Sequence, residues 1–170
     1  LWTVFDLSLN YNHAIRSRIK WMSTTLTLLI FLMILSGGLV AGTRAGIPFP
    51  TWPLMGDTFI PPQIYSMNPS WLSAFEDMAT IQFNHRMFAY LLTIFIVIFA
   101  IVLLRSNVPR FLKNGTTALL FVLSLQVALG ISTLIFYIPI PVAAAHQVGA
   151  IALLSVSLFI THSCLSREQI

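Results

Sequence analysis

Four long apolar stretches dominate the chain, and polar residues separate them. They cover residues 21–42, 83–104, 115–137 and 141–162. Each is close to the length of about 20 residues that an α-helix needs to cross a bilayer. Each must be helical, because lipid offers no hydrogen-bond partner to a bare backbone amide. The pattern predicts an all-α membrane protein, built as a four-helix transmembrane bundle with a long loop between the first two helices.

Composition supports lipid as the main solvent. Hydrophobic residues make up 57% of the 170 residues and charged residues only 8%, whereas a soluble domain carries about 25% charged residues. We expect one domain over residues 21–162, flanked by polar segments 1–20 and 163–170. The net charge of +4 does not indicate nucleic-acid binding, because the basic residues lie at the ends of apolar stretches. The chain begins with Leu, so we expect a fragment or a missing natural start.

The basic residues predict the orientation of the four spans. With four spans, both termini and the connection between the second and third lie on one side. Seven of the nine Lys and Arg residues fall on that side: Arg16, Arg18, Lys20, Arg105, Arg110, Lys113 and Arg167. Because basic residues favour the cytoplasmic side, we expect cytoplasmic termini. The long loop over residues 43–82 and the turn near residues 137–141 are then outside.

The long outer loop is rich in glycine, proline and aromatic residues. Glycine and proline favour turns, and Trp52, Phe59, Tyr65 and Trp71 suit the boundary between lipid and water. Loops of this length usually have a task, so we expect a lid over the outer mouth of the bundle. The alternative is a connector on the membrane surface with no site.

Two histidines lie inside the predicted spans, where ionisable residues are functional candidates. His85 is near the start of the second span and His146 near the start of the fourth. Both spans run inward, so both imidazoles lie within roughly 5–8 Å of the outer boundary, at about 1.5 Å of rise per residue. Parallel helices can face each other across a bundle, and two imidazoles can provide both axial ligands of a haem iron. His13 and His162 lie near polar ends and can reach the interface.

Small residues gather at the depth of His85 and His146, where a flat porphyrin would need space between helices. They are Gly37, Gly38, Ala41, Gly42, Ala89, Gly130, Ser132, Thr133, Ala143, Ala144, Ala145, Gly149 and Ala150. The alternative is helix packing alone, since a pair of glycines four residues apart is itself a packing motif.

Three further polar residues complete the candidate site. Arg86 and Arg44 can bind carboxylates such as haem propionates, which suit a guanidinium; the alternative is simple anchoring at the interface. Gln126 lies in the middle of a span, and we expect it to bond across helices to a partner that the sequence does not identify.

Five short motifs, taken together, are specific. In chain order they are GGLVAGTRAG (37–46), TWPLMG (51–56), MATIQFNHR (78–86), QVALGISTL (126–134) and AHQVGA (145–150). With them the chain resembles the haem A synthase family, specifically its carboxy-terminal half. Members of this family have two related four-helix halves. The resemblance implies that His85 and His146 are the axial iron ligands of a haem b, which is a cofactor and not the substrate.

The resemblance also implies the reaction and its limits. Members of the family are oxidoreductases of haem A biosynthesis. Their amino-terminal half oxidises the C8 methyl of haem O to a formyl group. Gln82 stands where that half has a glutamate, so we expect no catalytic residue in this chain. Cys164 is the one cysteine, so the paired cysteines of that half are absent. The missing catalytic half would bind the haem O.

The same resemblance implies a setting in the cell. It implies the bacterial inner (plasma) membrane, with the haem site near the outer face. The implied partners are haem O synthase, cytochrome c oxidase assembly factors, membrane lipid and further copies in an oligomer, with no nucleic acid.

Two other functions stay open from the sequence. One is a bis-histidine membrane cytochrome b that carries electrons with quinone. Such proteins often hold haems at both depths, and His162 is the single inner candidate for a ligand. The other is a haem-free packing or assembly subunit.

Overall fold

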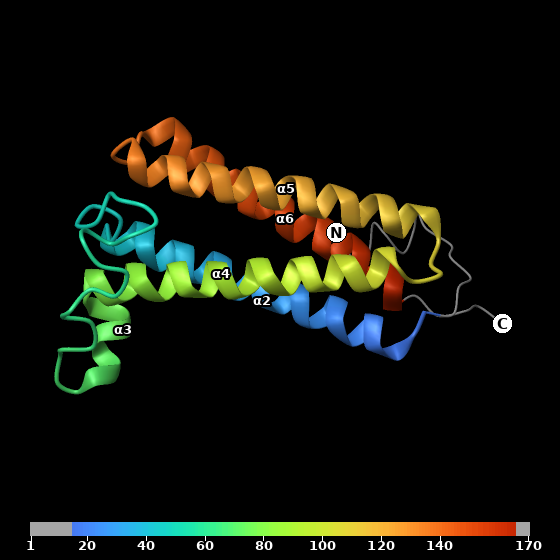
Figure 1. Cartoon of the computed structure of the whole chain (residues 1–170), viewed down its shortest axis with the longest axis horizontal. Helices are drawn as coiled ribbons and strands as arrows, with labels where there is room; N and C mark the ends of the chain where they lie inside the picture. Colours follow the sequence, from blue (N-terminus) through green and yellow to red (C-terminus); the bar gives the residue numbers. More distant parts are fainter. Residues whose placement is uncertain (1–14, 166–170) are drawn as a thin grey trace.

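The computed structural model describes residues 15–165, and this part of the chain is helical apart from its connections. Its elements are α2 (Ser17–Thr43), η1 (Ser70–Leu72), α3 (Ser73–Glu76), α4 (Met78–Leu104), α5 (Arg110–Ile135) and α6 (Ile140–Leu165) (Figure 1). The four long helices are long and apolar enough to cross a membrane. The predicted all-α four-helix bundle is confirmed. His13 and Arg167, both named above, lie outside the described residues.

Three of the long helices begin four or five residues earlier than the apolar pattern predicts. They start at Ser17, Met78 and Arg110. Asp77 and Pro109 precede the starts of α4 and α5, so polar caps and prolines set these two starts. Before α4, the Asp77 side chain accepts a hydrogen bond of 2.9 Å from the Thr80 amide, which satisfies one of the unpaired donors of the first turn. The long loop therefore spans residues 44–77 and contains the two short helices.

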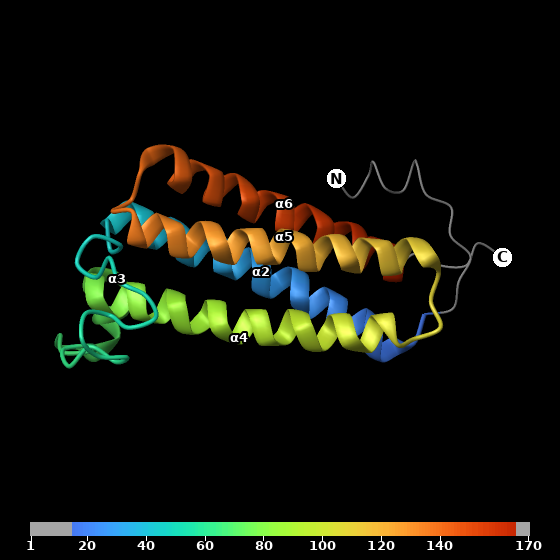
Figure 2. The same ribbon diagram turned by 45° about the horizontal axis from the view of Figure 1, so that its top comes forward.

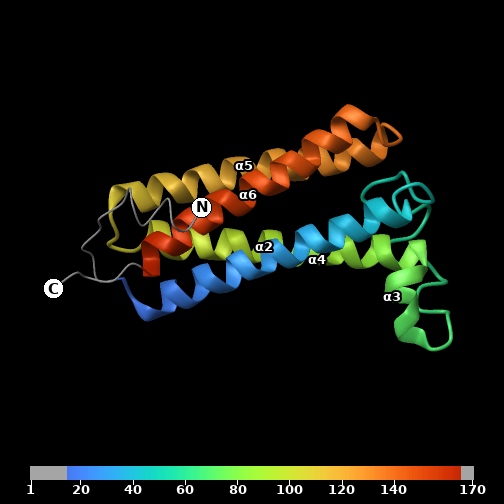
Figure 3. The same cartoon turned by 180° about the vertical axis from the view of Figure 1, so that it is seen from behind.

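The long helices run up and down, so the bundle has two ends. The loop end carries the connection between α2 and α4 together with the turn between α5 and α6. The opposite end, called here the terminal end, carries the α4–α5 connection and both ends of the described chain (Figures 1 and 2). Helix α2 packs against α4 and α6, and α5 packs against α6 and α4. Seen from behind, α2 and α6 are the nearer helices of the bundle (Figure 3).

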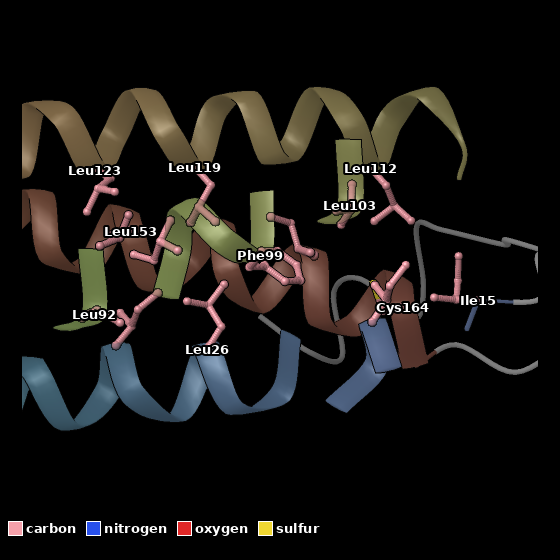
Figure 4. Packing of buried hydrophobic residues seen from close by; sticks show 14 residues of the cluster. Ile15, Leu26, Leu92, Phe99, Leu103, Leu112, Leu119, Leu123, Leu153 and Cys164 are labelled. Atoms are coloured by element: carbon pink, nitrogen blue, oxygen red, sulfur yellow. The ribbon is translucent and has the colours of Figure 1, made fainter. Parts of the chain in front are cut away.

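The apolar core lies in the terminal half of the bundle. Side chains from all four long helices converge there (Figure 4). Its fully buried members include Leu26, Ile96, Phe99, Leu103, Leu112, Leu119 and Ile160. In α2, α5 and α6, no described residue nearer the loop end than Ile30, Leu123 and Leu153 is buried. In the loop-end half, these three helices therefore have no buried apolar core.

Candidate functional site

The two intramembrane histidines lie at the same end of the bundle. His85 is roughly two turns into α4 and His146 roughly two turns into α6, and both helices begin at the loop end. Both side chains are half-buried. The structure thus places the pair that the sequence singled out at one depth of the bundle.

Helix α2 supports the imidazole of His85. The ring Nδ1 lies 3.0 Å from the hydroxyl oxygen of Ser36, a hydrogen bond in which either atom can donate. The next residue is Gly37, and a Cβ added there would lie 3.4 Å from His85 Cε1. The ring of His85 therefore lies against the α2 backbone at Gly37. No motif pointed to Ser36, although a serine at this depth in an apolar helix was a usable signal.

Helix α5 supports the imidazole of His146. The ring Nδ1 lies 3.1 Å from the backbone carbonyl oxygen of Gln126. Because a carbonyl only accepts, Nδ1 must carry the proton, which leaves the lone pair of a neutral ring on Nε2. A Cβ added at Gly130 would lie 2.9 Å from His146 Cε1, closer than real Cβ contacts. The ring therefore needs glycine at position 130.

The structure identifies the partner of Gln126, which the sequence left open. Its side-chain Nε2 donates to the backbone carbonyl of His146 over 2.9 Å. The predicted hydrogen bond across helices therefore exists, and it ends on the residue that carries the second imidazole.

The donors at this site fit a haem. Each ring uses Nδ1 in a hydrogen bond, and neither Nε2 has a partner among residues 15–165. Metal-binding histidines typically hold their second ring nitrogen in this way. In the described part of the chain, no three His, Cys, Asp or Glu side chains gather around a point. A haem needs only two protein ligands, because the porphyrin supplies four nitrogens.

Arg86 binds the long loop. Its Nη1 donates to the Leu54 carbonyl at 3.1 Å, and its Nη2 donates to the carbonyls of Phe49 and Thr51 at 3.0 and 2.7 Å. Only 6% of the side chain is exposed. Gln82, one turn earlier, donates from Nε2 to the same Phe49 carbonyl at 3.0 Å. Both Nη groups are thus bonded to the loop, and a contact between Arg86 and a propionate stays a prediction.

Arg44 lies at the end of α2, at the loop end. Its backbone is left-handed, with φ 57°, and its amide bonds back to the Ala41 carbonyl, so it caps the helix. Its side chain is exposed. A role toward a propionate stays a prediction here too.

The rest of the long loop follows the surface of α4. The Tyr65 hydroxyl donates to Asn84 Oδ1 at 2.9 Å, and the Tyr65 amide donates to the Thr80 hydroxyl at 3.0 Å. The rings of Phe59 and Tyr90 stack with centroids 6.5 Å apart. The loop's first residues also reach the turn between α5 and α6. The loop therefore connects the two sides of the loop end.

The contact with that turn is close. A Cβ added at Gly46 would lie 3.1 Å from Ile138 Cδ1.

His162 lies at the other end of the bundle and is only 1% exposed. It is packed inside and does not face the interface, where the sequence analysis placed it.

Comparisons with known proteins agree on one family. A family model described as "Cytochrome oxidase assembly protein" matches residues 1–158. The heme A synthases of Nitrosospira multiformis and Paracoccus denitrificans are each 39% identical over 95% of this chain, which covers 46% and 44% of those proteins. The heme A synthase COX15 of Bos taurus is 39% identical over 78% of this chain and 32% of its own length. The chain thus spans about half the length of the curated relatives it matches. No solved structure matches.

Proposed function

The chain belongs to the family of cytochrome oxidase assembly proteins, and from that membership we propose that it is the haem-binding half of a haem A synthase. The whole oxidoreductase converts the C8 methyl of haem O into the formyl group of haem A. The observation that supports this most is the histidine pair at the loop end. Each of its rings is fixed through Nδ1 and has Nε2 without a partner among the described residues.

In this proposal His85 and His146 hold a haem b through their Nε2 atoms. A haem b with two imidazole ligands accepts and releases single electrons. Ser36 and the Gln126 carbonyl orient the two rings, and Gly37 and Gly130 leave room for them. Arg86 holds the loop against the helix turn that carries His85. Arg86 and Arg44 remain candidates for contact with the propionates.

Gln82 supports assigning the oxidation to another half. Its amide donates to a backbone carbonyl, which an ionised glutamate cannot do because it has no proton to give. The side chain is 2% exposed and lies beside Arg86 on the loop. We therefore place no catalytic residue in this chain, and haem O binds in the amino-terminal half.

A haem spectrum tests the proposal. The purified chain should show the six-coordinate, low-spin spectrum of a b-type haem. His85→Ala and His146→Ala should each remove that signature. If both variants keep it, the ligand assignment is wrong. If the chain shows no Soret absorption when expressed with adequate haem, it is the haem-free assembly subunit.

A bis-histidine carrier that works with quinone would give the same spectrum. The haem A content of cells that lack the gene separates the two functions. Loss of haem A supports the synthase, and unchanged haem A supports the carrier. The proposal also places the chain in the bacterial inner membrane, near haem O synthase and cytochrome c oxidase assembly factors.

A further inference from the structure

We propose that Gln126 is a positioning residue that fixes the plane and the proton of the His146 imidazole. This proposal rests on the proposed function, in which His146 binds a haem iron. The contacts that carry it lie between α5 and α6, at the Nδ1 and Cε1 atoms of the ring.

Gln126 and His146 exchange two hydrogen bonds in opposite directions. The Gln126 side chain donates from Nε2 to the His146 backbone carbonyl at 2.9 Å. The His146 ring donates from Nδ1 to the Gln126 backbone carbonyl at 3.1 Å. Each residue therefore offers a side-chain donor and a backbone acceptor to the other. A rotation or shift of either helix breaks both bonds at once.

A glycine makes each of these carbonyls reachable. A helical carbonyl points toward the residues three and four positions later, whose side chains normally cover it. Gly130 is four residues after Gln126, and the imidazole occupies the space of its missing side chain. Gly149 is three residues after His146, and a Cβ there would overlap Gln126 Oε1. The two helices therefore present matching gaps, each filled by a side chain of the other.

The arrangement also has an unpaired atom. Gln126 Oε1 is buried without a hydrogen-bond partner in the described structure, and burying an unpaired carbonyl is unfavourable. A leucine would fill the same space without that cost, so simple packing does not favour glutamine here. The Gln126 side-chain amide contributes an N–H donor, and its hydrogen bond to the His146 carbonyl connects α6 to α5. The carbonyl at residue 126 then keeps the proton on Nδ1, and Nε2 keeps its lone pair for the iron.

The test uses the haem-loaded chain and measures the haem, not only the protein. Electron paramagnetic resonance of the oxidised low-spin haem reports the planes of the two imidazoles. Gln126→Leu should shift the largest g value and weaken haem retention by about tenfold to hundredfold, the usual cost of losing a residue that orients a metal ligand. Gly149→Ala should act in the same direction, because its methyl displaces the Gln126 amide.

Ser124→Ala is the matched control on the same helix. Its hydroxyl bonds only to its own helix, at Leu120, so the haem signal should not change. Unchanged g values and haem retention in both Gln126→Leu and Gly149→Ala would overturn the positioning role, even if thermal stability falls. Should Gln126→Leu fail to fold, Gly149→Ala decides alone. A wild-type chain without a low-spin haem signal would instead overturn the proposed function, and this inference with it.

Discussion

Glycines face both histidines of the pair, but not all glycines at this depth do so. Gly37 and Gly130 lie against the rings of His85 and His146. Gly38, in contrast, has nothing within 4 Å of the position where a Cβ would stand. Gly37 and Gly130 therefore lie against the rings, and Gly38 does not.

Gly130→Ala should disturb the site by adding a single methyl group beside the His146 ring. The new Cβ would lie 2.9 Å from His146 Cε1, so the ring must move away from the Gln126 carbonyl. We expect haem retention to fall by about tenfold or more, as for other losses of a group that orients a ligand. Haem titration of the purified variants measures this.

Gly115→Ala is the control for that substitution, because its methyl also meets a ring closely, 3.1 Å from Phe159 Cε1, but at the terminal end of α5. It should bind haem like the wild type. Equal haem binding by Gly130→Ala and Gly115→Ala would show that the His146 ring does not depend on position 130.

The sequence predicted the two histidines but only part of what holds them. Depth along a span follows from residue number, so His85 and His146 could be matched. Ser36 and the direction of Gln126 depend on how each helix is rotated about its axis. Helices that are apolar on all sides carry little signal of which face turns inward. The partners of the rings therefore needed the three-dimensional structure.

At the scale of elements, the long loop is attached to α4 by side chains that come from α4. Gln82 and Arg86 bind the backbone of residues 49–54. Asn84 holds Tyr65, and Tyr90 stacks on Phe59. The predicted lid is thus fixed mainly to one helix, the one that carries His85.

Arg86→Lys should loosen this loop although it keeps the charge. A lysine ammonium is a point donor and lacks the planar fork that reaches several carbonyls. Hydrogen bonds to a charged group contribute about 1.5–3 kcal/mol each, and about 1.4 kcal/mol is a factor of ten. Losing even one should speed amide exchange in residues 49–56 by about tenfold, measured by hydrogen–deuterium exchange.

Arg44→Lys is the matched control, since Arg44 is an exposed arginine at the same end of the bundle. Its exchange pattern should match the wild type. If Arg86→Lys and Arg44→Lys give the same exchange rates, Arg86 does not hold the loop.

The elements were predictable in number and kind, but not in their starts or their attachments. Apolar stretches predicted four helices, whereas Asp77 and Pro109 decide where α4 and α5 begin. The hydrogen bonds of Arg86 could not be predicted from the sequence, because their acceptors are backbone carbonyls, which every residue has. The sequence left a propionate and the interface open as partners of Arg86. The structure adds bonds to the loop backbone, and the propionate contact stays a prediction.

At the scale of the whole molecule, the two ends of the bundle differ in charge. Arg16, Arg18, Lys20 and the α4–α5 connection lie at the terminal end. The positive-inside tendency predicts that this end is cytoplasmic and the loop end is outside. Cysteine labelling can test this, because the native Cys164 is fully buried.

In intact cells, Asp57→Cys in the exposed loop should react with a membrane-impermeant maleimide. Asn107→Cys, exposed in the α4–α5 connection, should react only after the membrane is permeabilised. The unmodified protein gives the background from Cys164. The reverse labelling pattern would place the histidine pair at the cytoplasmic face.

In the proposed function, the uneven core separates the packing of the helices from the binding of haem. Leucine, isoleucine and phenylalanine contacts join the four helices in the terminal half, and these contacts need no prosthetic group to form. The loop-end half has few such contacts between helices, so it can stay receptive after the chain has inserted into lipid. In the proposed function, haem therefore enters a part of the bundle that has no packed apolar core to open, and its apolar ring adds contacts between the helices there.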